Sequence, residues 1–183
     1  MEIVQSAGAV QSVHVARVDS PIGSLRLAST AAALVFVELP HASGRGFAGW
    51  LARHAPGARV AEGFAPNRDA AKQILEFLDA KRRQFELALD LRGTPFQLEV
   101  WRALCAIPYG ETISYAELAR RVGRPRAVRA VGSANGANPL ALVVPCHRVV
   151  NSGGKLGGYG GGLELKARLL ALEHARPRQG DLL

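Results

Sequence analysis

Short apolar runs fill the first ninety residues of the chain and partly alternate with polar positions. Runs of this length, rich in Val and Leu, are typical of strands. The turn sequence Pro21-Ile22-Gly23 separates the first run from the second, which indicates a hairpin or meander. The three predicted strands span residues 13–19, 24–29 and 33–39.

A helical period follows these strands. Apolar residues recur at the spacing of one helix face at Ala71, Ile74, Leu75 and Leu78. Asn67 can cap this helix, and residues 85–91 then alternate like a final strand. We therefore expect residues 1–91 to form a small strand-rich scaffold domain with one long helix. Its histidines, His14, His41 and His54, have no visible partners in the sequence.

From residue 92 onward the pattern is helical. Thr94-Pro95-Phe96-Gln97 is a capping box with proline at the first helical position. Ser114-Tyr115-Ala116-Glu117 is a second capping box, and it opens a short helix that reaches Val122. A turn at Gly123-Arg124-Pro125 leads into a third helix, from Arg126 to about Asn135. Two short helices joined by a tight turn form a helix-turn-helix pattern. We expect a helical C-terminal domain over 92–175 and a tail over 176–183.

Composition narrows the class of protein. With 183 residues, 48% hydrophobic and 21% charged, the chain is that of a globular protein of one or two domains. No apolar run is long enough to span a bilayer, and the first fifteen residues lack the pattern of a secretory signal. We therefore expect a protein that has no membrane partner and resides in the cytoplasm.

Positive charge is concentrated in the second half of the chain. Of the net charge of +8, residues 91–183 carry +7, and no acidic residue lies between Glu117 and Glu164. Such asymmetry favours a polyanionic partner, most often nucleic acid, although a solvated basic face would give the same count. The third predicted helix is rich in small residues, which suits phosphates and the minor groove better than readout of base edges in the major groove. Tight helix packing is the alternative reading of those small residues.

The two cysteines lie 41 positions apart, at Cys105 and Cys146, and form no metal-type pair. Cys105 is interpreted as a small buried group. Cys146 follows the apolar run 140–144, which we interpret as a core strand, and precedes His147 and Arg148. A thiol in that electropositive setting favours the thiolate, so Cys146 is the candidate reactive group. An inert structural cysteine is the alternative.

Several blocks of the second half resemble the O6-alkylguanine-DNA alkyltransferases, also called methylated-DNA–protein-cysteine methyltransferases. The central block is Pro145-Cys146-His147-Arg148-Val149, preceded by Asn138-Pro139 and by Arg129-Ala130-Val131-Gly132. The other blocks are 92–97, 107–112, Ser114-Tyr115, the glycine-rich stretch around Tyr159 and 169–173. In the first ninety residues the resemblance is limited to Ser20-Pro21-Ile22-Gly23 and the general strand layout.

The resemblance implies a mixed α/β (α+β) fold, with a ribonuclease H-like N-terminal domain and a C-terminal winged helix-turn-helix domain. It also implies DNA repair by transfer of an alkyl group from the O6 of guanine to the protein itself. Cys146 would be the nucleophile. It would be activated through a water by His147 acting as base, and Glu173 would orient and polarise His147. Because the sequence offers no group to cleave the thioether product, the protein would react once. Activity on O4-alkylated thymine stays open.

By the same resemblance the damaged base is flipped out of the duplex, which is bound through its minor groove. Tyr115 would protonate the leaving guanine, Arg129 would fill the gap in the duplex, and Asn138 would bridge the turn before the active-site strand. The carbonyls of Cys146 and Val149 would accept from the exocyclic amine of the base. Monomeric action is expected, and clustering on DNA stays open.

The resemblance also assigns roles around the pocket. Tyr159 would pack near the leaving base, and Arg124 and Ser152 lie at positions that resemble contacts to the DNA backbone. Some members of the family carry a side-chain donor directly after this tyrosine, whereas this chain has Gly160. That difference predicts one hydrogen bond fewer and a wider pocket. The first half contains no cysteine, so we expect no zinc and no cofactor.

Two other functions are compatible with parts of the pattern. A winged-helix regulator would use the same basic helices without chemistry, and its Cys146 would be dispensable. A cysteine hydrolase would use Cys146 and His147 on esters or peptides, but the sequence offers no oxyanion-hole signature. The regulator leaves the 145–148 block and Glu173 unexplained, and the hydrolase makes the basic surface incidental.

Overall fold

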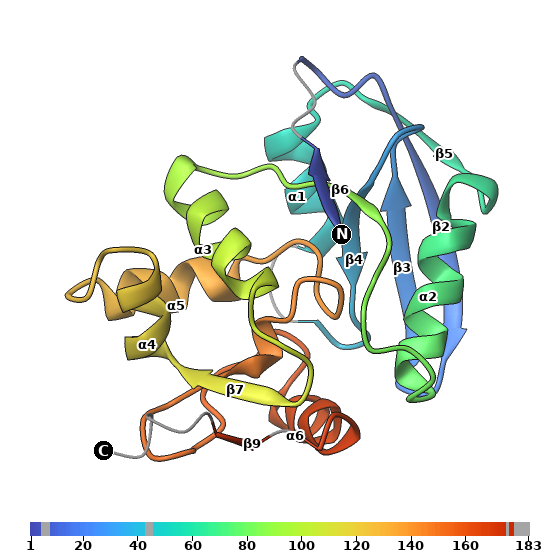
Figure 1. Cartoon of the computed structure of the whole chain (residues 1–183). Helices are drawn as coiled ribbons and strands as arrows, with labels where there is room; N and C mark the ends of the chain where they lie inside the picture. Colours follow the sequence, from blue (N-terminus) through green and yellow to red (C-terminus); the bar gives the residue numbers. More distant parts are fainter. Residues whose placement is uncertain (5–7, 43–45, 175, 178–183) are drawn as a thin grey trace. The chain divides into compact units, whose positions relative to one another are not determined.

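The computed structural model describes residues 1–4, 8–42, 46–174 and 176–177 (Figure 1). The chain divides into two compact units, one of Met1–Arg92 with Pro139–Val143 and the other of Gly93–Asn138 with Val144–Leu183. The division after Arg92 lies one residue from the expected boundary. Pro139–Val143 was expected in the second domain, but its contacts are with the first unit.

The first unit is built on a mixed six-stranded sheet with the strand order β1-β6-β4-β3-β2-β5. β2 pairs antiparallel with β3, and β3 with β4, whereas the other three pairings are parallel. The strands are β1 (Glu2–Val4), β2 (Ser12–Ser20), β3 (Gly23–Ser29), β4 (Leu34–Glu38), β5 (Arg59–Glu62) and β6 (Ala88–Asp90). The predicted meander is therefore confirmed, and the strand expected over 85–91 is shorter than its pattern.

Two helices, rather than the one predicted, cover the sheet of this unit: α1 (Gly46–His54) and α2 (Arg68–Leu78). α1 lies against β4 and α2 against β2 (Figure 1). Phe47 and Trp50 of α1 pack on Phe36, each with ring centroids 5.8 Å from it. This helix was missed because only a few apolar residues mark its buried face. The short strands β1 and β5 were missed for the same reason.

Asn67 occupies the N-cap position of α2, but its side chain does not cap the helix. It is fully buried, and its Nδ2 donates to the carbonyls of His14 (3.0 Å) and Gly63 (2.8 Å). Asn67 therefore ties the start of the helix to the sheet. The sequence pattern located the residue correctly but not the partner of its amide.

The apolar run 140–144 is not the predicted strand. Leu140 forms a single β-bridge with Val37, whose N–H donates to the carbonyl of Pro139 at 2.8 Å. The residues after Leu140 form a turn in which Leu142 has φ +73°. The run is buried throughout, and burial without a clear period does not distinguish a strand from a packed turn.

The second unit is mainly helical. Its helices are α3 (Pro95–Cys105), α4 (Tyr115–Arg121), α5 (Val128–Gly136) and α6 (Leu163–Leu172), with a 3-10 helix at Cys146–Arg148. A parallel sheet of order β8-β7-β9 joins β7 (Glu111–Ser114) to β8 (Val149–Val150) and β9 (Arg176–Pro177). The first two residues of the expected tail therefore pair with β7, and residues 178–183 lie outside the described part. The Trp101 indole N–H donates to the carbonyl of Ala134 at 2.8 Å and fixes α3 on α5.

The two predicted capping boxes differ in the structure. The box at Thr94 and Gln97 is confirmed, with both reciprocal hydrogen bonds present. Ser114 accepts from the Glu117 N–H, but the Glu117 carboxylate pairs with Arg120 and Arg121 instead of completing the box. Among the residues described, no helix is long and apolar enough to cross a membrane.

Candidate active site

Cys146 is the first residue of the 3-10 helix that follows the buried turn, and only 6% of its surface is exposed. Burial raises the pKa of its thiol, while a hydrogen bond with Asn138 and the charge of Lys166 oppose that rise. Burial therefore acts against the thiolate that the neighbouring cations are expected to favour. The guanidinium of Arg148, on which that expectation rested, is bound to other groups.

Asn138 follows α5 directly and spans the segment that precedes the thiol. Its Nδ2 donates to the carbonyl of Val144 at 2.8 Å. This hydrogen bond connects the two ends of the segment Pro139–Val143, which belongs to the first unit. The same amide group reaches the Cys146 thiol. Asn138 thus links the end of α5 to the backbone just before Cys146.

His147 and Glu173 form a fully buried pair. The His147 Nε2 lies 2.9 Å from the Glu173 Oε1, and Glu173 sits at the C-cap of α6. Burial lowers the pKa of His147, against the opposing effect of Glu173, so the imidazole is neutral near pH 7. Burial alone would raise the pKa of Glu173, but hydrogen bonds from His147 and Arg148 outweigh burial and lower it to about 2.

Arg148 approaches the same carboxylate from another side. Its Nε and Nη2 each lie 2.9 Å from a Glu173 oxygen, and its Nη1 donates to the Ile107 carbonyl at 2.6 Å. The N–H of Gly110 also donates to Glu173, at 3.2 Å. Sequence reasoning treated Arg148 only as a nearby positive charge, because nothing in the sequence links it to Glu173 or Ile107.

Lys166 is a buried cation on the core-facing side of α6. Its Nζ donates to the carbonyls of Val149, Leu156 and Gly158. Burial lowers its pKa to about 8, and the charge of Cys146 opposes that shift. This residue was missed, although a lysine among the apolar positions of a helix is a detectable signal. Its hydrogen bonds connect β8 to the glycine-rich loop, and its charge acts on the Cys146 thiol.

Tyr115, the first residue of α4, lies close to the glycine-rich loop. Its hydroxyl is 3.5 Å from the Gly158 carbonyl, and its ring centroid is 6.0 Å from the Lys166 Nζ. Burial raises the pKa of this phenol, so it keeps its proton near neutral pH. Gly157 has φ +67°, and a Cβ there would lie 3.1 Å from the Tyr115 ring. The same Cβ would lie 3.0 Å from the Asn151 Oδ1, so any other residue needs a strained φ and a shift of the Asn151 or Tyr115 side chain.

Tyr159 stands edge-on to His147, with ring centroids 6.4 Å apart. Within the described residues its buried hydroxyl has no hydrogen-bond partner. Burial raises the pKa of Tyr159 well above 10, and the charges of Cys146 and Glu173 act in the same direction. The structure therefore brings five predicted residues together: Cys146, His147, Glu173, Asn138 and Tyr115, with Tyr159 beside them.

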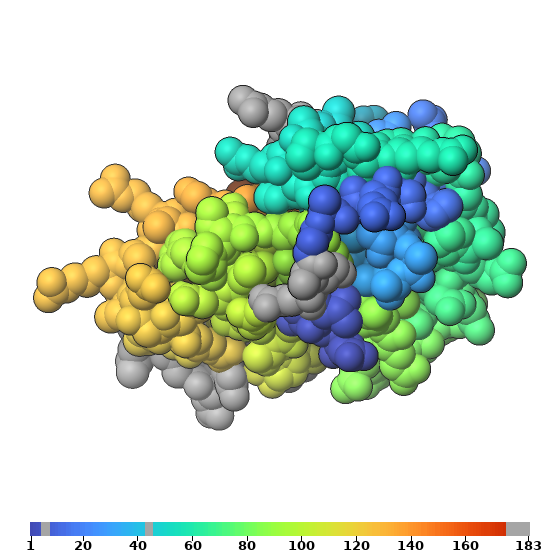
Figure 2. Space-filling view, turned by 90° about the horizontal axis from the view of Figure 1, so that it is seen from above, coloured from blue at the N-terminus to red at the C-terminus, as the bar shows by residue number. Residues whose placement is uncertain are grey.

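The predicted DNA-contacting residues lie on the surface of the same unit. Arg129 is exposed in the first turn of α5, and Ser152 and Gly160 are exposed in the loops after β8. Side chains of the gold-coloured segment of α4 and α5 project outward in Figure 2. Arg124 is also exposed, but it lies 3.4 Å from Glu99 and over the Phe96 ring. Val149, in contrast, is buried, and its carbonyl already accepts from Lys166.

In the parts of the chain that the structure covers, no group of three or more His, Cys, Asp or Glu side chains is arranged to hold a metal ion. The Cys146 thiol instead has the Asn138 amide and the backbone N–H groups of Cys146 and His147 as hydrogen-bond partners, with the charge of Lys166 nearby.

Comparison with known proteins decides the family. A family model described as the DNA binding domain of 6-O-methylguanine DNA methyltransferase matches residues 95–175. The methylated-DNA–protein-cysteine methyltransferase of Mycolicibacterium paratuberculosis is 48% identical over 159 residues, which are 85% of this chain and 89% of that protein. This chain belongs to the methylated-DNA–protein-cysteine methyltransferase family.

Other members of this methyltransferase family are also similar to this chain over most of its length. The inducible enzyme of Bacillus subtilis is 42% identical, over 85% of this chain and 87% of its own. The crystal structure of Mycobacterium tuberculosis OGT in complex with DNA matches with a TM-score of 0.76 and 43% identity, covering 92% of this chain and 97% of that one. The mixed α/β fold of this chain is therefore that of solved methyltransferases.

Proposed function

We propose that Cys146 is the cysteine to which this methyltransferase transfers an alkyl group from the O6 of guanine in DNA. The observation that carries the proposal is the buried arrangement in which the residue after Cys146, His147, is hydrogen-bonded to Glu173 at 2.9 Å. In a chain of this family, such a pair next to the thiol would serve as the base that takes its proton through a water. Among the described residues, no hydrogen bond links Cys105 to a His–carboxylate pair, and burial raises the pKa of its thiol to about 11.

The proton on the imidazole defines the role of each ring nitrogen. An ionised carboxylate only accepts hydrogen bonds, so the His147 Nε2 that faces Glu173 carries the proton. The Nδ1 is then the nitrogen that accepts a proton from the direction of Cys146. The thiolate is formed at the moment of reaction rather than stored, which agrees with the raised pKa of the resting thiol.

The transfer itself is a displacement at carbon. The Cys146 sulfur forms a bond to the alkyl carbon while the bond from that carbon to the guanine oxygen breaks, and the electron pair leaves with the base. Tyr115 protonates the departing guanine, for which its raised phenol pKa keeps a proton available. The product is a thioether on Cys146, so each molecule reacts once.

Access to the base requires that it leave the duplex. We assign α4, the turn after it and α5 to a helix-turn-helix in a winged domain, and the first unit to a ribonuclease H-like scaffold. α5 would enter the minor groove, where its small residues permit close approach, and Arg129 would occupy the space of the flipped base. The protein would act as a monomer.

Smaller contacts complete the proposed site. Tyr159 would pack beside the flipped base, and the carbonyls of Cys146 and Val149 would accept from its exocyclic amine. Arg124 and Ser152 would contact the DNA backbone, which for Arg124 requires release from Glu99. Gly160 would leave space on the side of the alkyl group, since a Cβ there meets nothing within 4 Å.

The decisive experiment is intact-protein mass spectrometry after incubation with a duplex that contains one O6-methylguanine. The wild type should gain about 14 Da, one methyl in place of the thiol hydrogen, localised to Cys146. Cys146→Ala should gain nothing and still bind DNA, while Cys105→Ala should react like the wild type. Tight binding of the wild type without a mass gain would reduce the protein to a DNA-recognition module.

A further inference from the structure

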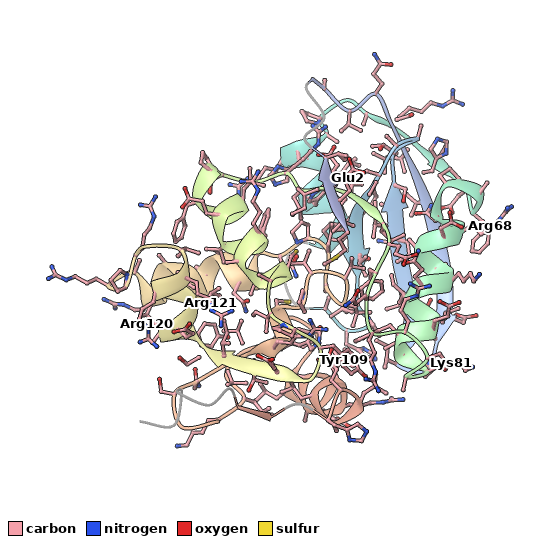
Figure 3. All side chains as sticks on the ribbon, viewed as in Figure 1. Glu2, Arg68, Lys81, Tyr109, Arg120 and Arg121 are labelled. Atoms are coloured by element: carbon pink, nitrogen blue, oxygen red, sulfur yellow. The ribbon has the colours of Figure 1, made fainter. Side chains whose placement is uncertain are left out.

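Arg148 is a buried arginine whose guanidinium is held at both ends. Its Nε lies 2.9 Å and 3.2 Å from the two Glu173 oxygens, and its Nη2 lies 2.9 Å from Oε1. At the other end, Nη1 donates to the Ile107 carbonyl, and the guanidinium carbon stands 5.8 Å from the Tyr109 ring centroid. Figure 3 labels Tyr109, whose hydroxyl donates to the Leu172 carbonyl.

This arrangement leaves the Glu173 carboxylate little freedom to rotate. Oε2 accepts from Arg148 and from the Gly110 N–H, and Oε1 accepts from Arg148 and faces His147. Side-on pairing with a planar guanidinium fixes the plane of a carboxylate as well as its charge. The turn between α3 and β7, the 3-10 helix and the end of α6 therefore meet at this single carboxylate.

The orientation of Glu173 decides which nitrogen of His147 carries the proton. A protonated carboxyl group can donate to Nε2, and the proton of a neutral imidazole would then lie on Nδ1; an ionised carboxylate only accepts, and it holds the proton on Nε2 as long as one of its oxygens faces that nitrogen. In that tautomer Nδ1 no longer accepts a proton from the thiol. Loss of the correct tautomer is known to disable histidine bases even when the geometry is kept.

We propose that Arg148 is a positioning residue for alkyl transfer: its fork holds Glu173 ionised and in one orientation, so that His147 keeps its proton on Nε2. The predicted change in transfer rate rests on the proposed function. The predicted change in the His147 tautomer does not. The positive charge beside His147 also lowers the pKa of the imidazole and so favours the neutral base.

A purely structural salt bridge is the rival explanation, and it predicts different behaviour. Removing one partner of a buried pair destabilises a fold whatever the pair does, because the other charge is left unpaired. The test therefore needs a readout besides stability. It also needs a background in which the carboxylate charge is already absent.

The experiment compares Arg148→Met and Arg148→Lys in the wild-type and Glu173→Gln backgrounds, using single-turnover rates on O6-methylguanine duplex. Arg148→Met should slow transfer by about 10²-fold, within the range for loss of a positioned base, with unchanged affinity for DNA. Arg148→Lys should recover part of the rate. In the Glu173→Gln background, Arg148→Met should change the rate by less than about twofold, as for residues that act through one group.

The tautomer is read directly by nitrogen-15 NMR of the imidazole in the absence of DNA, with His147 identified by the signals missing from His147→Gln. The wild type should show the proton on Nε2, and Arg148→Met should shift it toward Nδ1. An unchanged tautomer in folded Arg148→Met, or the same rate loss in both backgrounds, would overturn the proposal.

The same set of variants distinguishes a failure to fold from a failure of the proposed function. If Arg148→Met does not fold, the double variant with Glu173→Gln, which removes both charges, is compared with Glu173→Gln alone, and a loss of rate there counts against Arg148. If wild-type protein fails to alkylate Cys146, the proposed function fails. The tautomer measurement still decides the role of Arg148 in that case.

Discussion

The second unit carries positive charge in two different ways. Around Cys146 the cations Arg148 and Lys166 are buried, and each is held by specific carbonyl or carboxylate oxygens. On α4, α5 and the turn between them, arginines such as Arg120, Arg124 and Arg129 are exposed to solvent. The same residue type therefore fixes geometry in one region and supplies a surface field in the other.

The difference follows from the dielectric surroundings. A buried charge must be paired, so its partners define one arrangement, and salt in the solvent screens it little. An exposed arginine is worth little to stability, and its attraction to phosphates falls with ionic strength. The buried region should therefore respond to pH and to loss of single partners, and the exposed region to salt.

The largest expected effect is on acid stability of the buried region. Because hydrogen bonds hold the pKa of Glu173 at about 2, below its ordinary 4.5, folding is favoured while the carboxylate is charged. This stability is complete above pH 4.5 and is lost as pH falls toward 2, about 3 kcal/mol in all. Urea unfolding at several pH values should show this loss in the wild type but not in Glu173→Gln. Glu164→Gln, which removes an exposed carboxylate of α6, is the control and should behave like the wild type. A Glu173→Gln profile parallel to that of the wild type would contradict the assignment.

Arg129→Ala tests the exposed region. Transfer from O6-methylguanine in duplex DNA should slow by about 10-fold, because the space of the flipped base is no longer filled. Reaction with the free base O6-benzylguanine should be unchanged, and Arg68→Ala, an exposed arginine of the first unit, serves as control (Figure 3). Equal losses with both substrates would remove Arg129 from the DNA-dependent step.

Gly157→Ala examines the loop that borders both regions. With φ +67° and a Cβ only 3.1 Å from the Tyr115 ring, alanine should cost about 1 kcal/mol in stability and slow transfer by displacing the tyrosine. Gly154→Ala is the matched control, because Gly154 also has a positive φ, +78°, but a Cβ there meets nothing within 4 Å. Thermal unfolding and single-turnover rates measure both effects. Equal behaviour of the two variants would show that the ring contact is unimportant.

Gly160→Ser should give the smallest change. The position has room for a side chain. In the proposed site, a hydroxyl there would donate toward the guanine oxygen. A gain of a few-fold in rate on O6-methylguanine is expected, on the order of one neutral hydrogen bond. Gly160→Ala should give no gain. A gain of equal size in Gly160→Ala would assign the effect to the backbone rather than to the hydroxyl.

Local patterns predicted several elements well. The meander β2–β4, the capping box at Thr94 and the two helices α4 and α5 follow from short-range signals such as turn residues and helical spacing. The run before Cys146 was misread as a strand, and α1 was missed, because burial and a few apolar contacts set their structure rather than a clear period.

The sequence by itself determined the chemistry available: one thiol beside a histidine and an arginine, a basic second half and the blocks that identify the family. Only the tertiary structure decided which charges meet. Arg148 faces Glu173, 25 positions away, and Ile107, 41 positions away in the other direction, and Lys166 reaches three carbonyls of β8 and the loop. The physical reason is that a buried charge must find its partners in space, and the distance along the chain does not limit where those partners lie.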